Sequence, residues 1–479
     1  MQTMLGRGAA LAARGSAVHA RCLSTASAEE LAKKIEASGH NQVKLSVADI
    51  DGVLRGKFIS AEKALGMLRG DQTLQFCSVI FGWDVADQLY DNGKFAGWHT
   101  GYPDITAKLD LSSYRELPWE NNKPFFMLDF VTDKDHTKAL DVCPRRLLRT
   151  VTSQLESELN AGAYCGPELE WHNFRGDYQS MSDNKFSGKP LSPGMFGYSL
   201  LRTGQNHEFF NRIFEDMAKF GVTIEGLHTE TGPGVMEAAI KYTDPVNAAD
   251  SATLFKYGVK IIGSQLGIFP NFMAKPSTTL PGNSGHLHQS LYDLTSKANL
   301  FYDESKPDCM SDLFRSYVAG QLLCLPQMMP MFCPTINSYK RLVEGFWAPV
   351  SATWGVENRT SSLRVIPAGP KATRIETRIG GADANTYLSL AASLASGLYG
   401  IRNNLKLEDG IVGTQAVTPE NSIPRTLAEA TARMRDSKVA NELFGEGFVE
   451  HYTLTRDWEV KQYQTQVTDW ELNRYAEII

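Results

Sequence analysis

The chain has 479 residues, of which 42% are hydrophobic and 21% charged, the composition of a globular protein with more than one domain. The net charge of -6 comes without a basic stretch beyond the N-terminus, which argues against nucleic acid or an anionic membrane surface as a partner. The most apolar run, residues 321–332, contains two prolines and is shorter than the roughly 20 residues of a membrane-spanning helix.

The first 27 residues have the composition of an organellar targeting segment. They contain Arg7, Arg14 and Arg21, and no acidic residue precedes Glu29. The arginine spacing puts all three on one helical face, as mitochondrial import requires, although a disordered tail of the same composition is the alternative. The seven cysteines include no C-x-x-C pair, which fits a reducing compartment. We therefore expect a transit peptide at residues 1–27 and a protein of the mitochondrial matrix.

Residues 28–135 are expected to form a small first domain. It begins with a helix at residues 28–38, and a turn at residues 49–52 joins its first two strands. The expected strands span residues 42–48, 53–59, 75–81 and 106–109.

Residues 136–479 are expected to form a larger second domain. Pro144 suits the first turn of a helix that would run to Leu159. Apolar residues at helical spacing indicate further helices at residues 206–220, 248–266, 311–325 and 385–401. The last of these is apolar on almost every face and should be buried.

Residues 166–174, GPELEWHNF, place Glu168 and Glu170 two positions apart. In a strand, such residues point to the same face about 6 to 7 Å from each other, which is a metal-ligand geometry. A carboxylate pair on a solvated strand face is the alternative. Two further segments repeat this spacing. One carries His286 and His288, and the other carries Arg374, Glu376 and Arg378. The repetition favours a shared site over a solvated strand face.

Together these segments would turn many charged groups toward one cavity. They are Glu168, Glu170, Glu230, Glu237, Glu376, His286, His288, Arg341, Arg359, Arg364, Arg374 and Arg378. Oxygen-rich ligands with few nitrogens select Mg²⁺ or Mn²⁺, and clustered carboxylates repel one another unless cations are bound. The arginines beside them indicate a strongly anionic ligand. ATP with an acidic substrate satisfies both demands.

Seven motifs carry a family resemblance. In chain order they are GPELEWHNF, HTETGPGVME, FMAKP, SGHLHQSL, NSYKRL, ENRTSSLRV and RIETR. In this order they resemble the glutamine synthetase family, from about Val43 to the C-terminus, and the ordered set is far more specific than any one motif. The resemblance implies an α+β fold, with a small N-terminal β-grasp domain and a large catalytic domain whose curved antiparallel sheet is surrounded by helices. It also implies homo-oligomeric rings, a dodecamer or decamer, with active sites shared between neighbours.

The resemblance also implies roles for individual residues. One metal site would use Glu170, Glu230 and Glu237, and the second Glu168, His286 and Glu376. The nucleotide would contact His288, Ser290, Arg364 and Arg374, although for Ser290 and Arg364 an ordinary surface or ion-pair role remains open. Glutamate would contact Gly282, Arg341, Arg359 and Arg378, and the last two arginines would also face the transferred phosphoryl group.

The implied chemistry follows from the weakness of a carboxylate as an acyl donor. The γ-carboxylate of glutamate would first accept the γ-phosphoryl group of ATP, with metals and arginines neutralising the charge of the transition state. Ammonia or a primary amine would then displace phosphate to form an amide. A non-catalytic assembly protein on the same scaffold is the alternative, and the complete set of metal ligands argues against it.

Three positions depart from the ammonia-using members of the family. The flap glutamate is replaced by Trp347, and a customary glutamine by Val235. For the aspartate of the ammonium pocket the segment FGWDVAD offers Asp84 or Asp87, without the customary glycine-serine context, and we place it at Asp84. The aromatic flap residue is more similar to the γ-glutamylpolyamine synthetase branch, so Trp347 is expected to contact an amine acceptor. A packing role for Trp347 and Val235 is the alternative.

Overall fold

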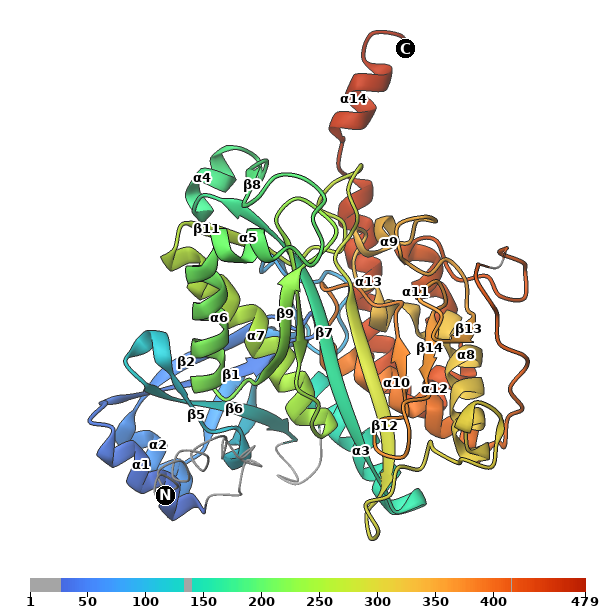
Figure 1. Ribbon diagram of the computed structural model, residues 1–479. Helices are drawn as coiled ribbons and strands as arrows, with labels where there is room; N and C mark the ends of the chain where they lie inside the picture. The colour runs from blue at the N-terminus through green and yellow to red at the C-terminus, as the bar shows by residue number, and fades with distance from the viewer. Residues whose placement is uncertain (1–26, 133–139, 415) are drawn as a thin grey trace, which may run out of the picture.

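The computed structural model describes residues 27–132, 140–414 and 416–479, so the expected transit peptide lies outside the described residues. Two β-sheets organise the fold, and helices surround them (Figure 1). The N-terminal sheet is drawn in blue to cyan and the larger sheet in green to orange. Within the described residues, no helix is long and apolar enough to cross a membrane.

The N-terminal sheet has six strands in the order β2-β1-β6-β4-β3, with β5 paired to β6. The strands are β1 (Gln42–Ala48), β2 (Leu54–Ser60), β3 (Leu74–Cys77), β4 (Asp104–Leu109), β5 (Arg115–Leu117) and β6 (Lys123–Val131). Strand β1 runs parallel to β6, and the other pairs are antiparallel. The accompanying helices are α1 (Ala28–Ala37), α2 (Ala61–Arg69), η1 (Ser78–Phe81), η2 (Leu111–Ser113) and η3 (Pro118–Glu120).

One expected strand of this domain was too long. The strand predicted at residues 75–81 ends at Cys77, and Ser78–Phe81 form the short 3₁₀ helix η1. Ser78, Ile80 and Phe81 are buried, so the segment contributes to the core without pairing. Periodicity alone cannot separate a short apolar strand from a buried turn of helix.

The larger sheet has nine strands in the order β13-β14-β15-β12-β7-β10-β9, with β8 and β11 also paired to β7. The strands are β7 (Ala161–Arg175), β8 (Lys189–Pro190), β9 (Ile224–Thr229), β10 (Val235–Ile240), β11 (Ile268–Asn271), β12 (Gly285–Asp293), β13 (Trp354–Val356), β14 (Leu363–Ile366) and β15 (Arg374–Thr377). The sheet is antiparallel, as expected, except that β13 runs parallel to β14.

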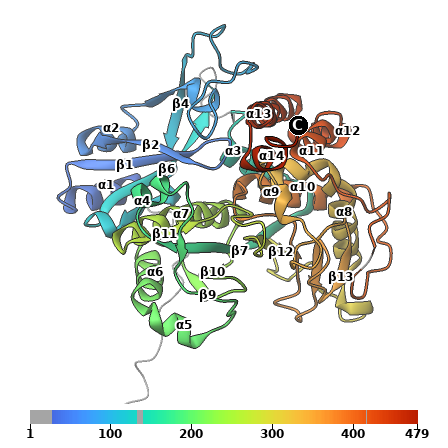
Figure 2. The same ribbon diagram turned by 90° about the horizontal axis from the view of Figure 1, so that it is seen from above.

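Helices of the second domain cover this sheet (Figure 2). They are α3 (Pro144–Leu159), α4 (Tyr178–Asp183), α5 (Leu200–Gln205), α6 (His207–Lys219), α7 (Pro245–Gln265), η4 (Pro307–Cys309), α8 (Asp312–Phe332), α9 (Ser338–Arg341), α10 (Thr386–Arg402), α11 (Leu427–Arg435), α12 (Lys438–Phe444), α13 (Glu446–Gln464) and α14 (Asp469–Tyr475). Helix α10 is buried along nearly its whole length, as its composition predicts, and α14 extends away from the body of the chain.

Helix α8 is longer than the sequence pattern predicted. It continues through Pro326 and Pro330 to Phe332, although each proline removes a backbone donor. Met328, Met329 and Phe332 in this last part are all buried. Burial of these large side chains outweighs the lost hydrogen bonds, a tertiary effect that local propensity does not report.

A buried ion-pair network joins the two domains. Arg145, at the start of α3, is 1% exposed and donates to Asp250 of α7 at 2.9 and 2.8 Å. Its remaining donors reach Asp129 of β6 at 2.6 Å and Asp110. Tyr387 of α10 also donates to Asp250, at 2.5 Å. One guanidinium therefore fixes the N-terminal sheet against the helices behind the larger sheet.

Candidate active site

The central strand β7 brings the predicted ligands together through its register with β10 and β12. Glu168 lies opposite His286 of β12, and Glu170 lies opposite Glu237 of β10. On the far side of β12, His288 lies opposite Glu376 of β15. Because residues two apart in a strand share a face, these groups all project from the same side of the sheet, as the sequence spacing predicted.

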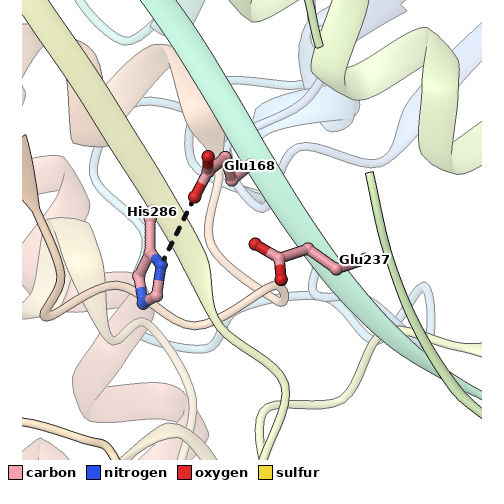
Figure 3. Close-up of side chains that lie close together, drawn as sticks. All are labelled: Glu168, Glu237 and His286. Carbon is pink, nitrogen blue, oxygen red and sulfur yellow. Dashed lines mark ion pairs between the residues drawn. The ribbon is translucent and has the colours of Figure 1, made fainter. Parts of the chain in front are cut away.

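Three groups of side chains place potential ligand atoms within 4.8 Å of one another. Figure 3 shows one of them, in which Glu168, His286 and Glu237 point toward a common centre. The groups are Glu168, Glu237 and His286; Glu168, His288 and Glu376; and His228, Glu230 and Glu237. Five of the six predicted ligands belong to these groups. The sixth, Glu170, accepts a hydrogen bond from the backbone N–H of Ser284 at 2.5 Å.

The carboxylates of this cluster differ strongly in their electrostatic surroundings. Burial, together with the charges of Glu170, Glu168 and Glu230, raises the pKa of Glu237 to about 9. Burial would also raise the pKa of Glu376, but His286 and Arg378 lower it to about 2. Hydrogen bonds from His286 and His288 likewise outweigh burial at Glu168 and lower its pKa. The carboxylates of the acid-rich half of the cluster therefore repel one another, while the charges in the half beside the histidines are balanced.

The cluster fits divalent cations. Oxygen donors predominate, which suits hard cations, and a bound cation would remove the repulsion that raises the pKa of Glu237. The Nε2 atom of His286 is buried without a hydrogen-bond partner among the described residues, and His288 Nε2 lies 3.2 Å from Glu168 Oε1. Buried imidazole nitrogens normally have a partner, and a metal or a ligand group would supply one here.

Three predicted arginines line the side of the cluster formed by β14 and β15. Arg374 Nε donates to His288 Nδ1 at 3.2 Å. Arg364 Nη1 donates to Glu376 Oε2 at 3.0 Å, and Arg378 Nη1 pairs with Glu376 Oε1. Glu376 therefore receives two guanidinium groups, which together present positive charge beside the second metal group.

Arg341 and Gly282, two of the residues predicted to contact glutamate, lie against each other. Arg341 is buried and donates to the carbonyl oxygens of Ile379, at 3.0 Å, and Arg378, at 3.2 Å. A Cβ on Gly282 would come within 2.8 Å of Arg341 Cγ and 2.3 Å of the Ala274 carbonyl oxygen. Only glycine allows the loop to approach Arg341 this closely.

Other predicted site residues have no contact that fixes their role. Arg359 is exposed, and Ser290 lies on β12, two positions beyond His288 on the same face. Asp84 is 8% exposed, and its carboxylate accepts from the amides of Ala86 and Gln88 and from Trp458 Nε1. Within the chain, Asp84 thus holds its own loop against α13, and its catalytic role stays a prediction.

Comparison with known proteins decides the family. Residues 141–475 match the catalytic domain of glutamine synthetase. The chain belongs to the glutamine synthetase family. It is 50% identical over 443 residues to type-1 glutamine synthetase 2 of Dictyostelium discoideum, covering 91% of this chain and 84% of that one. It is 38% identical over 449 residues to the glutamate–isopropylamine ligase of a Pseudomonas species, covering 93% and 97%.

Two further comparisons agree with this family. The chain is 34% identical over 452 residues to the gamma-glutamylethanolamide synthetase GlnA4 of Streptomyces coelicolor, covering 94% of this chain and 95% of that one. A solved structure described as a GmaS/ADP complex has the same fold, with a TM-score of 0.79 at 23% identity, and covers 93% of this chain and 99% of the other.

This glutamine synthetase family member is therefore an ATP-dependent glutamate–amine ligase, which forms a carbon–nitrogen bond. The family uses ATP and divalent metal ions. When bound, the metals would neutralise phosphate charge during phosphoryl transfer. The protein supplies a face of carboxylates and imidazoles to hold them, with Arg364, Arg374 and Arg378 beside it.

Sequence reasoning missed two residues of this site. His228 of β9 lies opposite Glu237 and belongs to one of the three ligand groups. The Tyr198 ring contacts His228 in a tilted arrangement, with ring centroids 4.5 Å apart and an angle of 37° between the ring planes. The spacing rule would have found His228, since it lies two positions before Glu230 in HTE. No local signal marks Tyr198, because a loop far from β9 in the sequence brings it there.

Proposed function

We propose that the nitrogen acceptor of this ligase is a small organic primary amine, used in preference to ammonia. Two relatives that align over nearly their whole length have names that refer to an organic amine or its amide, a glutamate–isopropylamine ligase and a gamma-glutamylethanolamide synthetase. A third relative is named a glutamine synthetase, so the names alone do not decide between ammonia and an organic amine as the acceptor. Two residues of this chain, Trp347 and Val235, favour the amine.

Trp347 supports the proposal by its exposure and its place beside the substrate loop. It is 64% exposed and has a positive φ of 58°, so it is not a core residue of this chain. The neighbouring Phe346 ring lies 4.3 Å from Lys275 Nζ, which donates to the Leu280 carbonyl oxygen at 2.6 Å. The segment therefore lies against the loop that carries Gly282. An indole there can cover an alkyl chain and attract a second ammonium group, but it cannot accept a proton.

Val235 supports the proposal from the other side of the site. It is 2% exposed and follows the turn that begins at Glu230, whose backbone N–H donates to the Val235 carbonyl oxygen at 3.0 Å. A Cβ on Gly232 would come within 2.4 Å of Val235 Cγ2, so the valine fills this turn. Val235 thus has a packing role, and the wall it forms beside Glu230 is apolar. An apolar wall suits methylene groups better than NH₄⁺.

The reaction that we propose has two steps. Arg341 holds the α-carboxylate of glutamate, and the γ-carboxylate, facing Arg359 and Arg378, attacks the γ-phosphorus of ATP, breaking the bond to the bridging oxygen and releasing ADP. The amine nitrogen then attacks the acyl carbon, inorganic phosphate leaves, and the nitrogen loses its proton to solvent or a carboxylate. We further propose Mg²⁺ or Mn²⁺ as the metal, because oxygen ligands predominate in the cluster.

Competition between acceptors tests this proposal. Purified protein is supplied with ATP, Mg²⁺, glutamate and an equimolar mixture of ammonium, ethylamine, isopropylamine, ethanolamine and putrescine. The products are then quantified by mass spectrometry, which separates glutamine from each γ-glutamyl amide. We expect a γ-glutamyl amide to exceed glutamine. Glutamine as the main product contradicts the proposal.

We also propose a mitochondrial matrix location and a ring assembly. The location is supported by the acid-free, arginine-bearing leader before Glu29. It predicts cleavage between about Cys22 and Ala28, which sequencing the N-terminus of protein from purified mitochondria would test. An intact Met1 would contradict it. The ring is supported by the family resemblance, and its test is given in the Discussion.

A further inference from the structure

His172 lies next to the metal-ligand strand positions but has no place in the reaction as described so far. It follows Glu168 and Glu170 at the same two-residue spacing on β7, so it projects from the same face of the sheet. The side chain is 1% exposed and lies opposite Val235 of β10. It is therefore a buried imidazole at the substrate end of the catalytic face.

The hydrogen bonds of Asn283 fix the tautomer of this imidazole. Asn283 Nδ2 donates to the carbonyl oxygens of Asn271, at 3.1 Å, and Met273, at 2.7 Å. The amide oxygen Oδ1 must then be the atom that lies 2.7 Å from His172 Nδ1. Because this oxygen can only accept, Nδ1 carries the hydrogen and donates it. Nε2 carries the lone pair.

Asn283 is the centre of the loop that carries Gly282, which is predicted to contact glutamate. Its backbone N–H donates to the Ala274 carbonyl oxygen at 2.8 Å, and its own carbonyl oxygen accepts from Ala382 at 3.1 Å. The preceding residue is Gly282, which packs on Arg341. The following residue is Ser284, whose N–H donates to Glu170. A shift of Asn283 would move both neighbours.

The other edge of the imidazole faces the turn between Glu230 and Glu237. A Cβ on Gly232 would lie 3.7 Å from His172 Nε2, and Nε2 is buried with no hydrogen-bond partner among the described residues. An unpaired buried nitrogen destabilises a fold relative to an apolar ring of the same shape. The imidazole therefore costs stability at Nε2, and the hydrogen bond from Nδ1 to Asn283 offsets that cost.

We propose that His172 is a positioning residue for the ligase reaction. Its Nδ1–H orients Asn283, and through Asn283 it holds the loop 282–284 at the distance from Arg341 and Glu170 that glutamate binding requires. His172 acts through the loop and does not touch the reacting atoms. Since the loop holds glutamate equally in the ground state and the transition state, its loss raises KM and leaves kcat almost unchanged.

Steady-state kinetics of the full-length enzyme test this proposal with three single variants. His172→Phe keeps the ring and removes the donor, whereas His172→Asn places an amide nitrogen near the position of Nδ1. Asn283→Ala removes the acceptor. We expect His172→Phe and Asn283→Ala each to raise the KM for glutamate by about three- to ten-fold, the range of one neutral hydrogen bond. The KM of His172→Asn should stay within about two-fold of the unmodified protein.

Two controls separate positioning from a structural role. The Tm of His172→Phe should stay close to that of the unmodified protein, because two effects oppose each other: the unpaired Nε2 is gone, but Asn283 Oδ1 loses its donor. The double variant His172→Phe with Asn283→Ala should have no higher KM than either single variant, because both break the same contact. An unchanged KM in His172→Phe, additive effects in the double variant, or a lowered Tm without rescue by His172→Asn would each overturn the proposal.

Discussion

Glu168 and His286 lie directly opposite each other in the antiparallel pair of β7 and β12, with His286 Nδ1 3.8 Å from Glu168 Oε2 (Figure 3). This register places the metal ligands of two distant sequence segments on one face. A slip of one residue in this pairing would turn the ligands of one strand to the opposite face of the sheet. The metal site therefore depends on the register of β7 and β12.

The first prediction concerns Glu230. Glu230→Gln should reduce phosphoryl transfer by at least about a hundred-fold while the protein still folds, because a neutral amide keeps the shape but weakens metal binding. ATP-dependent phosphate release and circular dichroism measure the two effects. Glu225→Gln, an exposed change on β9, the strand that leads to Glu230, is the matched control. Activity close to normal at ordinary metal concentration would show that Glu230 is not a ligand.

A second prediction follows from the raised pKa of Glu237. In the metal-free folded protein this side chain stays protonated up to a pH of about 9, whereas in the unfolded chain its pKa is ordinary, near 4.5. Ionisation above pH 4.5 therefore favours the unfolded state, and the free energy of unfolding of the metal-free protein should fall as pH rises toward 9. Thermal unfolding in the presence of a chelator at pH 5, 7 and 9 measures this trend.

Metal binding at pH 7 should also release the proton of Glu237, since a cation needs the charged carboxylate. Calorimetry in buffers of different ionisation enthalpy counts the released protons, and we expect about one more per chain for the normal protein than for Glu237→Gln. Equal proton release by the two proteins would show that Glu237 is already ionised without metal.

Much of this site could be predicted from sequence because its ligands recur at two-residue spacing. That rule placed Glu168, Glu170, His286, His288 and Glu376 on one face, and the register of the strands confirms it. The helices α3, α6 and α10 were also predicted within about two residues, because their apolar periodicity is strong.

Other parts depended on contacts between distant segments, which no local pattern reports. The course of α8 through Pro326 and Pro330 reflects burial against the rest of the fold. The parallel pairing of β13 with β14 is set by the loop between them, which carries Arg359. The anchoring of Asp84 by Trp458 joins residues 374 positions apart.

The third prediction concerns the buried network of Arg145. Arg145→Met should destabilise the protein by about 3 to 5 kcal/mol, because it leaves Asp110, Asp129 and Asp250 close together with less positive charge among them. Denaturant unfolding measures the loss. Arg435→Met, which breaks an exposed pair with Asp457, is the control and should change stability by less than about 1 kcal/mol. Equal effects of the two changes would mean that the network does not hold the domains together.

A fourth prediction tests the proposed ring assembly. If neighbouring subunits complete each active site, dilution to the monomer should abolish activity, and specific activity should rise with protein concentration in parallel with assembly. Light scattering and ATP-dependent phosphate release on the same samples measure both quantities. Full specific activity in a confirmed monomer would refute shared active sites.

The role of Trp347 gives a fifth prediction. Trp347→Glu introduces a carboxylate that can attract ammonium and accept its proton, so the ratio of kcat/KM for ammonium to that for ethylamine should rise about ten-fold or more. Trp347→Phe keeps an aromatic face and should leave the ratio within about two-fold. If Trp347→Glu leaves the ratio unchanged, the indole does not contribute to acceptor choice.

The most direct test of the proposed function is kcat/KM for each acceptor measured separately. ATP-dependent phosphate release is followed with saturating glutamate and Mg²⁺, while ammonium, methylamine, ethanolamine, isopropylamine, putrescine or spermidine is varied. With Trp347 exposed beside the substrate loop and Val235 lining the turn after Glu230, we predict that at least one organic amine has a higher kcat/KM than ammonium. The highest kcat/KM for ammonium would contradict this account and identify the protein as an ammonia-using glutamine synthetase.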